Sequence, residues 1–410
     1  MKKIFYIIIA ISLFHQCAGA QWVQQSGGTT VTLYNIDFVD ANTGWIVGTA
    51  SKILKTTNGG LNWVTQIPSI PLNRELNDIQ MFDANTGYIG GWTNTFLKTT
   101  NGGDNWVQLT GPSVTNGSLN AISFNDVNTG WVCAFLGIIW RTTNGGLTWD
   151  SLNTGNTAQL RDIQFLNSQT GWVTGDVGYM RKTTNGGLNW FFQFFGTFSD
   201  YWYNSLMFIN VNTGWVVSYN NKVFRTTNSG INWDSVAITP GVCIHFVNAL
   251  TGWTGGDNGD IYKTTNGGLN FYQQSIPVMG GFFTDIEFVN DTVGWSVDVF
   301  VIMKTTNGGG EFVGIDPISN EFPQSYILDQ NYPNPFNPNT TIRFEIPKEE
   351  NVKIIVTDIL GKVIETIVDC RLKTGRYSVL FNADNLSSGM YFYTLITNNI
   401  TITKKMSLVK

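Results

Sequence analysis

The sequence predicts an all-β protein, in which a seven-bladed β-propeller is followed by a small antiparallel β-sandwich of the immunoglobulin-like kind. Three observations lead to this fold class. A unit of about forty residues recurs through most of the chain, and this period is typical of propeller blades. Glycine accounts for 44 of 410 residues, which indicates many tight turns between short strands. After Val313 the unit stops, and a different alternation of apolar and polar residues follows.

Composition and charge exclude several classes of protein. Aromatic residues make up 14% of the chain and charged residues only 13%, so the chain can bury enough apolar surface to fold. The net charge of −5 gives no electrostatic reason to expect a nucleic-acid partner. Beyond Cys17 the cysteines are Cys133, Cys243 and Cys370, and an odd number at wide separations does not predict a disulfide framework.

Residues 1–20 have the pattern of a secretory signal peptide. Lys2 and Lys3 precede the apolar run 4–14, and Ala18-Gly19-Ala20 forms a small-residue cleavage site, so the mature chain is expected to begin at Gln21. The apolar run is much shorter than the roughly 20 residues that a membrane-spanning helix needs. Lipid modification of Cys17 is a minor alternative.

Each repeat opens with two apolar residues at alternate positions, such as Ile36 and Phe38, and continues with a glycine-aromatic step such as Gly44-Trp45. The period of two predicts a strand with one buried face, and the glycine is expected to allow a tight turn. The repeat closes with Thr-Thr-Asn-Gly-Gly or a variant, and an aromatic residue stands five positions after the asparagine. The asparagines are Asn58, Asn101, Asn144, Asn185, Asn228, Asn266 and Asn307, and the aromatics are Trp63, Trp106, Trp149, Trp190, Trp233, Phe271 and Phe312.

This closing motif resembles the Asp-box hairpin, Ser/Thr-x-Asp/Asn-x-Gly-x-x-Trp, of sialidase-type and related propellers. Local chemistry explains its residues: the asparagine caps backbone amides, glycine adopts positive φ, and the aromatic packs between the hairpin strands. Together with the Thr-Gly-Trp step, the unit is similar to the propellers of photosystem II assembly and stability factors over about residues 21–312. That resemblance implies a protein that assists the assembly of a membrane complex rather than an enzyme.

The start of the mature chain is expected to close the ring of blades. Gln21-Trp22-Val23 matches Asn62-Trp63-Val64, which belongs to the strand that ends a repeat. We therefore expect Trp22 to lie in a strand that completes the last blade and removes a free sheet edge. Because Glu311-Phe312-Val313 competes for the same place, six or eight blades remain as alternatives to seven.

The propeller is expected to span residues 21–313, a linker residues 314–325, and a second domain residues 326–410. The second domain opens with Tyr332-Pro333-Asn334-Pro335-Phe336, contains Ser388-Gly389-Met390-Tyr391-Phe392-Tyr393, and ends with Lys404-Lys405-Met406-Ser407-Leu408-Val409-Lys410. In combination these features resemble the type A C-terminal sorting domain of the type IX secretion system of Bacteroidetes-like bacteria. An ordinary immunoglobulin-like adhesion domain is the alternative.

The resemblance of the second domain implies the destination and one partner. The type IX secretion machinery would recognise the domain, with Lys404 and Lys405 in the sorting signal. Export through the periplasm would then end in release or in attachment to surface lipopolysaccharide. A photosynthetic role is not implied, because such a tail belongs to a different bacterial lineage.

Catalytic signatures are scarce in the repeats. His245 is the single histidine of the mature chain, so neither a Ser-His-Asp triad nor a zinc site with clustered His/Cys ligands is expected. A sialidase needs three arginines around the substrate carboxylate. Arg141 and Arg225 occupy a repeat position shared with lysines, and this leaves Arg74, Arg161 and Arg181 for that role.

Another glycosidase would need two carboxylates across a groove. Asp78, Asp162 and Asp285 are candidates, but they share one column of the repeat with Asn35, Ala121, Ser205 and Cys243. A shared column fits capping at strand ends better than a unique catalytic pair. Asp257-Asn258-Gly259-Asp260 is explained by a hairpin turn rather than by a calcium site.

The segment from Trp190 to Tyr203 departs most from the repeat because it is crowded with aromatic residues. On a propeller face such a loop could stack on sugars or hold a protein. The alternative is that alternate members fill the space between blades. The candidate binding residues are Trp190, Phe195, Tyr201, Trp202 and Tyr203. We therefore expect a monomeric, non-enzymatic propeller without metal or cofactor that binds a protein or glycan, with a propeller glycoside hydrolase as the alternative.

Overall fold

The computed structural model of the protein describes residues 22–410 except 72, 114–116, 156, 194–201, 220–221, 239–240, 257–258, 275, 277–280, 310–322, 349, 373 and 384–385. Two compact units are present, one over Gln21–Glu311 and one that contains Phe312–Lys410. The described residues include no helix with the length and hydrophobicity needed to span a membrane.

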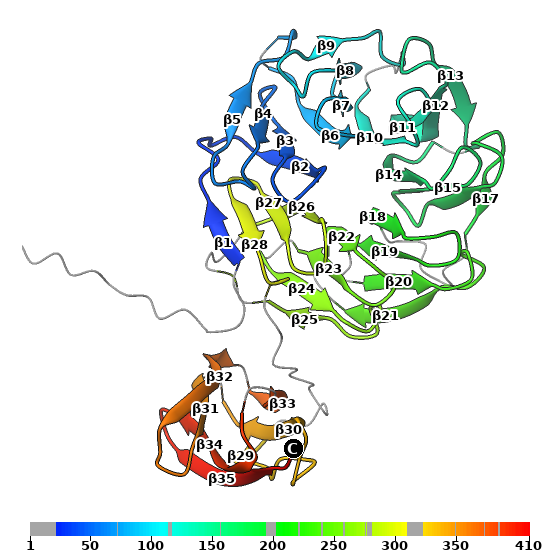
Figure 1. The fold of residues 1–410 in the computed structure, drawn as a ribbon. Coiled ribbons are helices and arrows are strands. Elements are labelled where there is room, and N and C mark those ends of the chain that lie inside the picture. The colour runs from blue at the N-terminus through cyan, green and yellow to red at the C-terminus, as the bar shows by residue number, and fades with distance from the viewer. Residues whose placement is uncertain are drawn as a thin grey trace, which may run out of the picture. The chain divides into compact units, whose positions relative to one another are not determined.

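The first unit is the expected all-β propeller. Its described residues form seven four-stranded antiparallel sheets, one for each repeat of the sequence. The first strands of the sheets surround the middle of the ring and the fourth strands lie at its rim (Figure 1).

The strands of the seven sheets are as follows. The inner strands are β2 (Leu33–Phe38), β6 (Leu76–Met81), β10 (Leu119–Phe124), β14 (Leu160–Phe165), β18 (Tyr203–Phe208), β22 (Cys243–Phe246) and β26 (Phe283–Phe288). The second strands are β3 (Gly44–Gly48), β7 (Gly87–Gly91), β11 (Gly130–Ala134), β15 (Gly171–Gly175), β19 (Gly214–Ser218), β23 (Gly252–Gly255) and β27 (Gly294–Asp298). The third strands are β4 (Ile53–Thr56), β8 (Thr95–Thr99), β12 (Ile138–Thr142), β16 (Met180–Thr183), β20 (Lys222–Thr226), β24 (Ile261–Thr264) and β28 (Ile302–Thr305). The outer strands are β5 (Val64–Gln66), β9 (Val107–Gln108), β13 (Asp150–Asn153), β17 (Phe191–Phe192), β21 (Asp234–Ile238), β25 (Tyr272–Gln273) and β1 (Trp22–Gln25), and a 3-10 turn, η1 (Phe135–Gly137), precedes β12.

The N-terminal strand closes the ring as the sequence predicted. β1 pairs with β28 in antiparallel register, Trp22 opposite Thr305, and completes the sheet of β26 and β27. Trp22 is buried and lies edge-on to Phe288, with ring centroids 5.7 Å apart, as Trp63 lies edge-on to Phe38 at 6.0 Å. The N-terminal tryptophan thus fills the position that a box aromatic fills in other blades. Phe312, the expected competitor, lies outside the described residues.

The closing motif folds as the expected capped hairpin, with one addition. The Asn62 N–H donates to Asn58 Oδ1 at 2.9 Å, and Gly59 and Gly60 have φ of 67° and 86°. Thr56 also caps the turn, because its Oγ1 accepts the Gly60 N–H at 2.8 Å and donates to Asn58 Oδ1 at 3.0 Å. The threonine-to-asparagine bond recurs in all seven boxes, so the threonine is part of the cap in each of them.

Neighbouring blades are joined through the aromatic residue of the glycine-aromatic step. Trp131 stacks on Phe165 of the next blade, with centroids 3.6 Å apart, and its indole N–H donates to the Gly186 carbonyl at 3.0 Å. The stacking recurs at Trp295–Phe38, Tyr88–Phe124, Trp172–Phe208, Trp215–Phe246 and Trp253–Phe288. Each blade therefore supplies one flat ring to the core of the next.

The glycine of this step is required by a side-chain contact and not, as expected, by a tight turn. Gly44 is absent from the residues with positive φ, and a Cβ built on it would lie 2.5 Å from the Phe38 ring. The same ring contact exists at Gly130, Gly171, Gly214, Gly252 and Gly294. The glycine is needed because the phenylalanine of the inner strand packs directly over the backbone of the second strand.

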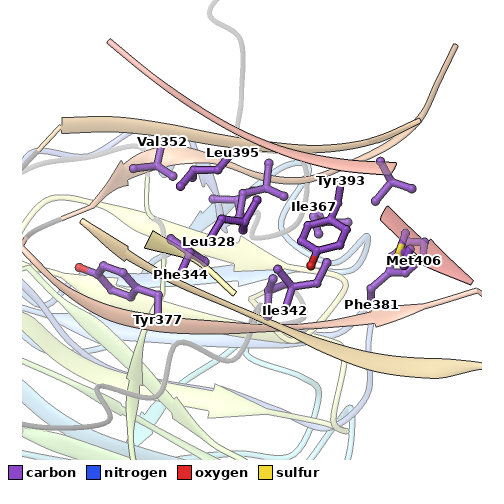
Figure 2. Packing of buried hydrophobic residues seen from close by; sticks show 14 of the residues in the cluster. Leu328, Ile342, Phe344, Val352, Ile367, Tyr377, Phe381, Tyr393, Leu395 and Met406 are labelled. Atoms are coloured by element: carbon purple, nitrogen blue, oxygen red, sulfur yellow. The ribbon is translucent and has the colours of Figure 1, made fainter. Parts of the chain in front are cut away.

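The second unit contains two antiparallel sheets around one core. One sheet has the order β29 (Ile327–Leu328), β30 (Asn339–Ile346), β33 (Gly375–Asn382), and the other has the order β32 (Val363–Leu372), β31 (Glu350–Thr357), β34 (Gly389–Thr397), β35 (Thr401–Leu408). Ile342 and Phe344 of the first sheet pack with Val352, Tyr393 and Leu395 of the second (Figure 2).

Candidate functional site

The inner strands carry two columns of polar side chains along the central channel. In the first column Asn35, Asp78, Asp162 and Asp285 each accept a backbone N–H from the inner strand of the next blade. The distances are 3.1 Å from Ile79 N to Asn35, 2.7 Å from Ile122 N to Asp78, 2.8 Å from Leu206 N to Asp162 and 3.0 Å from Ile36 N to Asp285. The candidate glycosidase carboxylates therefore cap the neighbouring strand. Asp162 and Asp285 also accept the N–H of the next residue of their own strand, at 2.7 Å from Ile163 N and 2.8 Å from Ile286 N.

The second column acts in the same way two residues further along. Gln80 Oε1 accepts the Phe124 N–H at 2.7 Å, Ser123 Oγ accepts the Phe165 N–H at 2.9 Å, and Asp37 accepts the Met81 N–H. His245 occupies this column, and burial lowers its pKa to about 4. His245 is therefore a neutral imidazole in a repeat position of the inner strand β22.

Burial raises the pKa of the carboxyl groups in both columns. It raises the pKa of Asp162 to about 6 and the pKa values of Asp37 and Asp285 to about 7, although the accepted N–H bonds act in the opposite direction. Burial also holds the pKa values of Asp78 and Glu287 well above their usual range. The channel consequently carries less negative charge near neutral pH than its five carboxyl groups suggest.

A cavity of about 690 Å³ opens at the end of the channel where the inner strands begin. Residues from all seven blades line it, among them Tyr34, Asp78, Ala121, Arg161, Cys243 and Asp285. Three of the aromatic lining residues expose large parts of their rings: Trp92 is 50% exposed, Trp202 45% and Tyr219 43%. The mouth of the channel thus combines aromatic surfaces with a polar floor, as ligand sites commonly do.

Trp202 is fixed in this mouth by its neighbours. The Tyr219 N–H donates to the Trp202 carbonyl at 2.9 Å, and the two ring centroids lie 5.9 Å apart. The Arg161 guanidinium lies over the indole, 5.3 Å from its centroid, and pairs with Asp176. The ring is held by a cation–π contact and a backbone bond while much of its surface remains accessible.

The other candidate binding residues do not share this position. Tyr203 is 1% exposed and packs edge-on to Phe224, so the expectation that it binds a ligand at the surface is wrong. The reason is that it begins β18, where its side chain points into the core beside the exposed Trp202. Trp190 lies edge-on to Phe165 as a box aromatic. Phe195 and Tyr201 lie outside the described residues, as do Asp257 and Asn258.

Trp92, Tyr219 and Phe135 contribute to the mouth but were missed in the sequence. They occupy the turns between second and third strands, where the repeats differ from one another. The turn itself recurs, because the pairs Ala50-Ser51, Thr93-Asn94, Leu136-Gly137 and Val177-Gly178 all adopt positive φ. The usable signal was therefore the residue that precedes each pair. Aromatic residues at otherwise small or polar turn positions were that signal.

The structure does not gather the arginines that a sialidase site requires. Arg161 is the arginine among the described residues that line the cavity, and Asp176 already neutralises it. Arg141 lies over the Trp131 ring, and Arg181 lies over Phe192. The described residues also contain no cluster of three or more His, Cys, Asp or Glu side chains that could hold a metal ion.

The predicted sorting residues lie on the edge strand β35 of the second unit. Lys404 is opposite Tyr393 and partly buried, while Lys405 is opposite Phe392 and exposed. The opening segment of the domain covers the same strand, because the Phe336 N–H donates to the Ser407 carbonyl and the Val409 N–H donates to the Phe336 carbonyl, both at 3.0 Å.

The model of one protein family, described as photosynthesis system II assembly factor YCF48, matches residues 15–70, 66–157 and 151–274. The chain belongs to this family. A second family model, described as a secretion system C-terminal sorting domain, matches residues 330–409. Two resemblances expected from the sequence are thereby confirmed, and the YCF48-like propeller is exported by type IX secretion to the cell surface or beyond.

Two solved structures of YCF48 share the propeller fold. YCF48 bound to a D1 peptide is 20% identical with a TM-score of 0.60, and the match covers 70% of this chain and 96% of that one. YCF48 from Cyanidioschyzon merolae is 18% identical with a TM-score of 0.58, over 70% and 98% of the two chains. No curated protein sequence matches the chain.

A further solved structure matches most of the chain. It is PorZ, a bacterial surface component of the type IX secretion system of Porphyromonas gingivalis, with 13% identity and a TM-score of 0.56. The match covers 94% of this chain and 60% of PorZ. At these identities the structural likenesses show the fold.

Proposed function

We propose that this YCF48-like propeller is a non-enzymatic binding module that holds a protein or glycan ligand at the mouth of its channel outside the cell. The observation that carries the proposal is the cavity of about 690 Å³ with Trp92, Trp202 and Tyr219 exposed at its opening. Exposed aromatic rings beside a concave polar floor are typical of sites that bind rather than of bare protein surface.

The hydrogen bonds of the floor support a binding role over catalysis. Asp78, Asp162 and Asp285 already accept backbone N–H groups from neighbouring blades, so a proton transfer there would weaken contacts between blades. The solved structure of YCF48 bound to a D1 peptide also supports a binding role, since that propeller binds a ligand. A photosynthetic role is not part of the proposal.

A propeller glycoside hydrolase is the second candidate, and one observation favours it. Asp162 and Asp285 line the cavity with pKa values raised to about 6 and 7, and a raised pKa is what a general acid needs near neutral pH. Turnover by a hydrolase would therefore depend on these carboxyl groups, whether or not it also depends on the mouth aromatics.

The test uses the mature chain and two single variants. Trp202→Ala removes a ring from the mouth, and Phe191→Ala removes a similarly exposed ring from the outer strand β17 as a matched control. Each protein is immobilised and exposed to surface proteins and polysaccharides of a host with type IX secretion, and hydrolysis of sialosides and polysaccharides is assayed in parallel. We expect a retained ligand that Trp202→Ala loses and Phe191→Ala keeps. Robust turnover by the unmodified protein, abolished in Asp162→Asn or Asp285→Asn, would instead establish the hydrolase.

A further inference from the structure

The chemistry of the mouth selects one class of ligand, and this inference rests on the proposed binding function. We propose that the ligand is a neutral oligosaccharide, which stacks on the rings of Trp92 and Trp202 and is hydrogen-bonded by the amide and hydroxyl groups between them. A cavity of about 690 Å³ is within the range of small-ligand sites, about 300–1,000 Å³.

Contacts within the protein hold both tryptophans in place before any ligand binds. The Trp92 N–H donates to the Glu75 carbonyl at 2.8 Å, and the Trp92 carbonyl accepts the Thr95 hydroxyl at 2.7 Å. Trp202 is held by Tyr219 and Arg161 as described above. Because the backbone of Trp92 and the ring of Trp202 are held in place and both rings are about half exposed, little conformational entropy is lost when the C–H face of a pyranose ring covers them.

The polar groups of the mouth suit hydroxyl groups rather than charges. Asn35, Ser118, Gln159, Asn204 and Thr284 line the cavity with both donors and acceptors.

The charges of the mouth disfavour anionic ligands. Arg161 is the cation of the described lining, and its pairing with Asp176 leaves no net positive charge there. Glu75 and the floor residues Asp78, Asp162 and Asp285 also line the cavity. A sialylated or sulfated sugar would meet Glu75 and the floor carboxyl groups, whose raised pKa values reduce but do not reverse their charge, and no unpaired cation of the described lining would compensate for its own charge.

The backbone of the channel also disfavours an extended peptide. Peptides commonly bind by adding a strand to a sheet edge, which requires unpaired N–H groups. Here the N–H groups of Ile36, Ile79, Ile122 and Leu206 on the inner edges are already donated to side chains of the preceding blades. The inner edges are therefore closed to strand addition, whereas stacking on the aromatic rings remains open.

The experiment measures binding of purified mature protein to a panel of defined oligosaccharides by calorimetry. The neutral members are β-1,4-glucan, β-1,3-glucan, xylan, mannan and chitin oligomers, and sialyllactose and a sulfated galactan oligomer are the anionic members. We expect at least one neutral oligomer to bind, with affinity unchanged between about 0.05 and 0.5 M salt because no charge is involved. Trp202→Ala and Trp92→Ala should each weaken it at least tenfold, while Phe191→Ala should not.

Three outcomes would overturn the inference. The first two leave the proposed binding function standing, and the third rejects that function as well. Preferential binding of an anionic oligomer, or binding that falls steeply with salt, would show that charge selects the ligand. Binding of no oligomer, together with a surface protein retained in a Trp202-dependent manner, would reject the sugar and keep the binding module. Equal behaviour of Trp202→Ala and Phe191→Ala with every ligand would reject both. Thermal unfolding of each variant confirms that the fold is intact.

Discussion

Backbone N–H groups on each inner strand face the channel, where no further strand is present to accept them. The protein satisfies them with side chains of the preceding blade, such as Asn35 for Ile79 and Asp78 for Ile122. These bonds link successive blades while leaving the channel open. The columns of Asp, Asn and Gln therefore provide acceptors for N–H groups of the inner strands that pair with no further strand. Their regular spacing in the sequence reflects this contact between neighbouring blades.

Asp285→Asn is expected to reduce the loss of unfolding free energy that accompanies a rise in pH from about 4 to above 7. Its pKa, about 7, is above the value of about 3.9 in an unfolded chain, so the folded state binds the proton more tightly and its stability falls as pH rises through about 4 to 7. Asparagine keeps one acceptor for the Ile36 N–H, as Asn35 accepts an equivalent N–H at 3.1 Å, and loses the oxygen that accepts the Ile286 N–H at 2.8 Å. Urea unfolding should therefore find the variant more stable than the parent at about pH 8 and nearly equal at about pH 4.

Asp104→Asn is the matched control for that comparison, because Asp104 is exposed on a box turn. It should leave the pH profile of the unfolding free energy unchanged. An Asp285→Asn protein whose profile parallels that of the parent would show that the carboxyl group at this position is not responsible for the pH dependence.

At the scale of a blade, two sets of aromatic rings pack in different geometries. The rings of the glycine-aromatic step stack face to face on the next blade, whereas the box aromatics lie edge-on at the periphery, as Trp149 does against Phe96 at 5.1 Å. Ser229 shows how closely the first set depends on the box. It replaces the first glycine of its box, its carbonyl accepts Lys182 Nζ at 3.0 Å, and the indole N–H of Trp172 has no acceptor among the described residues.

Replacing three tryptophans by alanine should separate these roles. Trp131→Ala removes a fully buried, stacked and hydrogen-bonded ring and should cost about 4 kcal/mol of unfolding free energy, and Trp149→Ala, which is half-buried, about 3 kcal/mol. Trp202→Ala should change stability little because its ring is largely exposed. Urea unfolding of the mature chain measures all three. A loss at Trp202 as large as that at Trp149 would mean that the mouth ring is a packing residue.

The repeat made the strands, the box hairpins and the closing role of Trp22 predictable, because each depends on a local pattern that recurs. The mouth of the channel was less accessible to this reasoning. Trp92 and Tyr219 lie in turns that differ from blade to blade, and a repeat pattern assigns no partner to such positions. Tyr203 was mistaken for a surface residue because aromatic density alone does not show which residue of a pair begins a strand and points inward. Gly44 needed the three-dimensional contact with Phe38 before its role was visible.

At the scale of the whole molecule, the second unit brings its two sequence signatures together. Residues 332–336 and 404–410 are separated by most of the domain, yet Asn334 Oδ1 accepts the Ser407 N–H at 2.9 Å and the Gln330 side chain donates to the Lys405 carbonyl at 2.7 Å. The opening segment therefore covers the outer edge of β35. Tyr332 and Lys405 are exposed on this composite surface, where the export machinery can reach both.

Deleting residues 326–410 should separate folding from export. Gln21–Glu311 forms a compact unit with its own closed ring, so the shortened chain should fold, cross the inner membrane by its signal peptide, and accumulate in the periplasm as a protease-resistant protein. Conversely, residues 326–410 fused to an inert reporter with a signal peptide should carry that reporter outside the cell. Fractionation of a host with type IX secretion measures both, and a host without that system provides the control. If the shortened chain reached the surface at the normal level, the propeller itself would contain the export signal, and the second unit would be better explained as an adhesion domain.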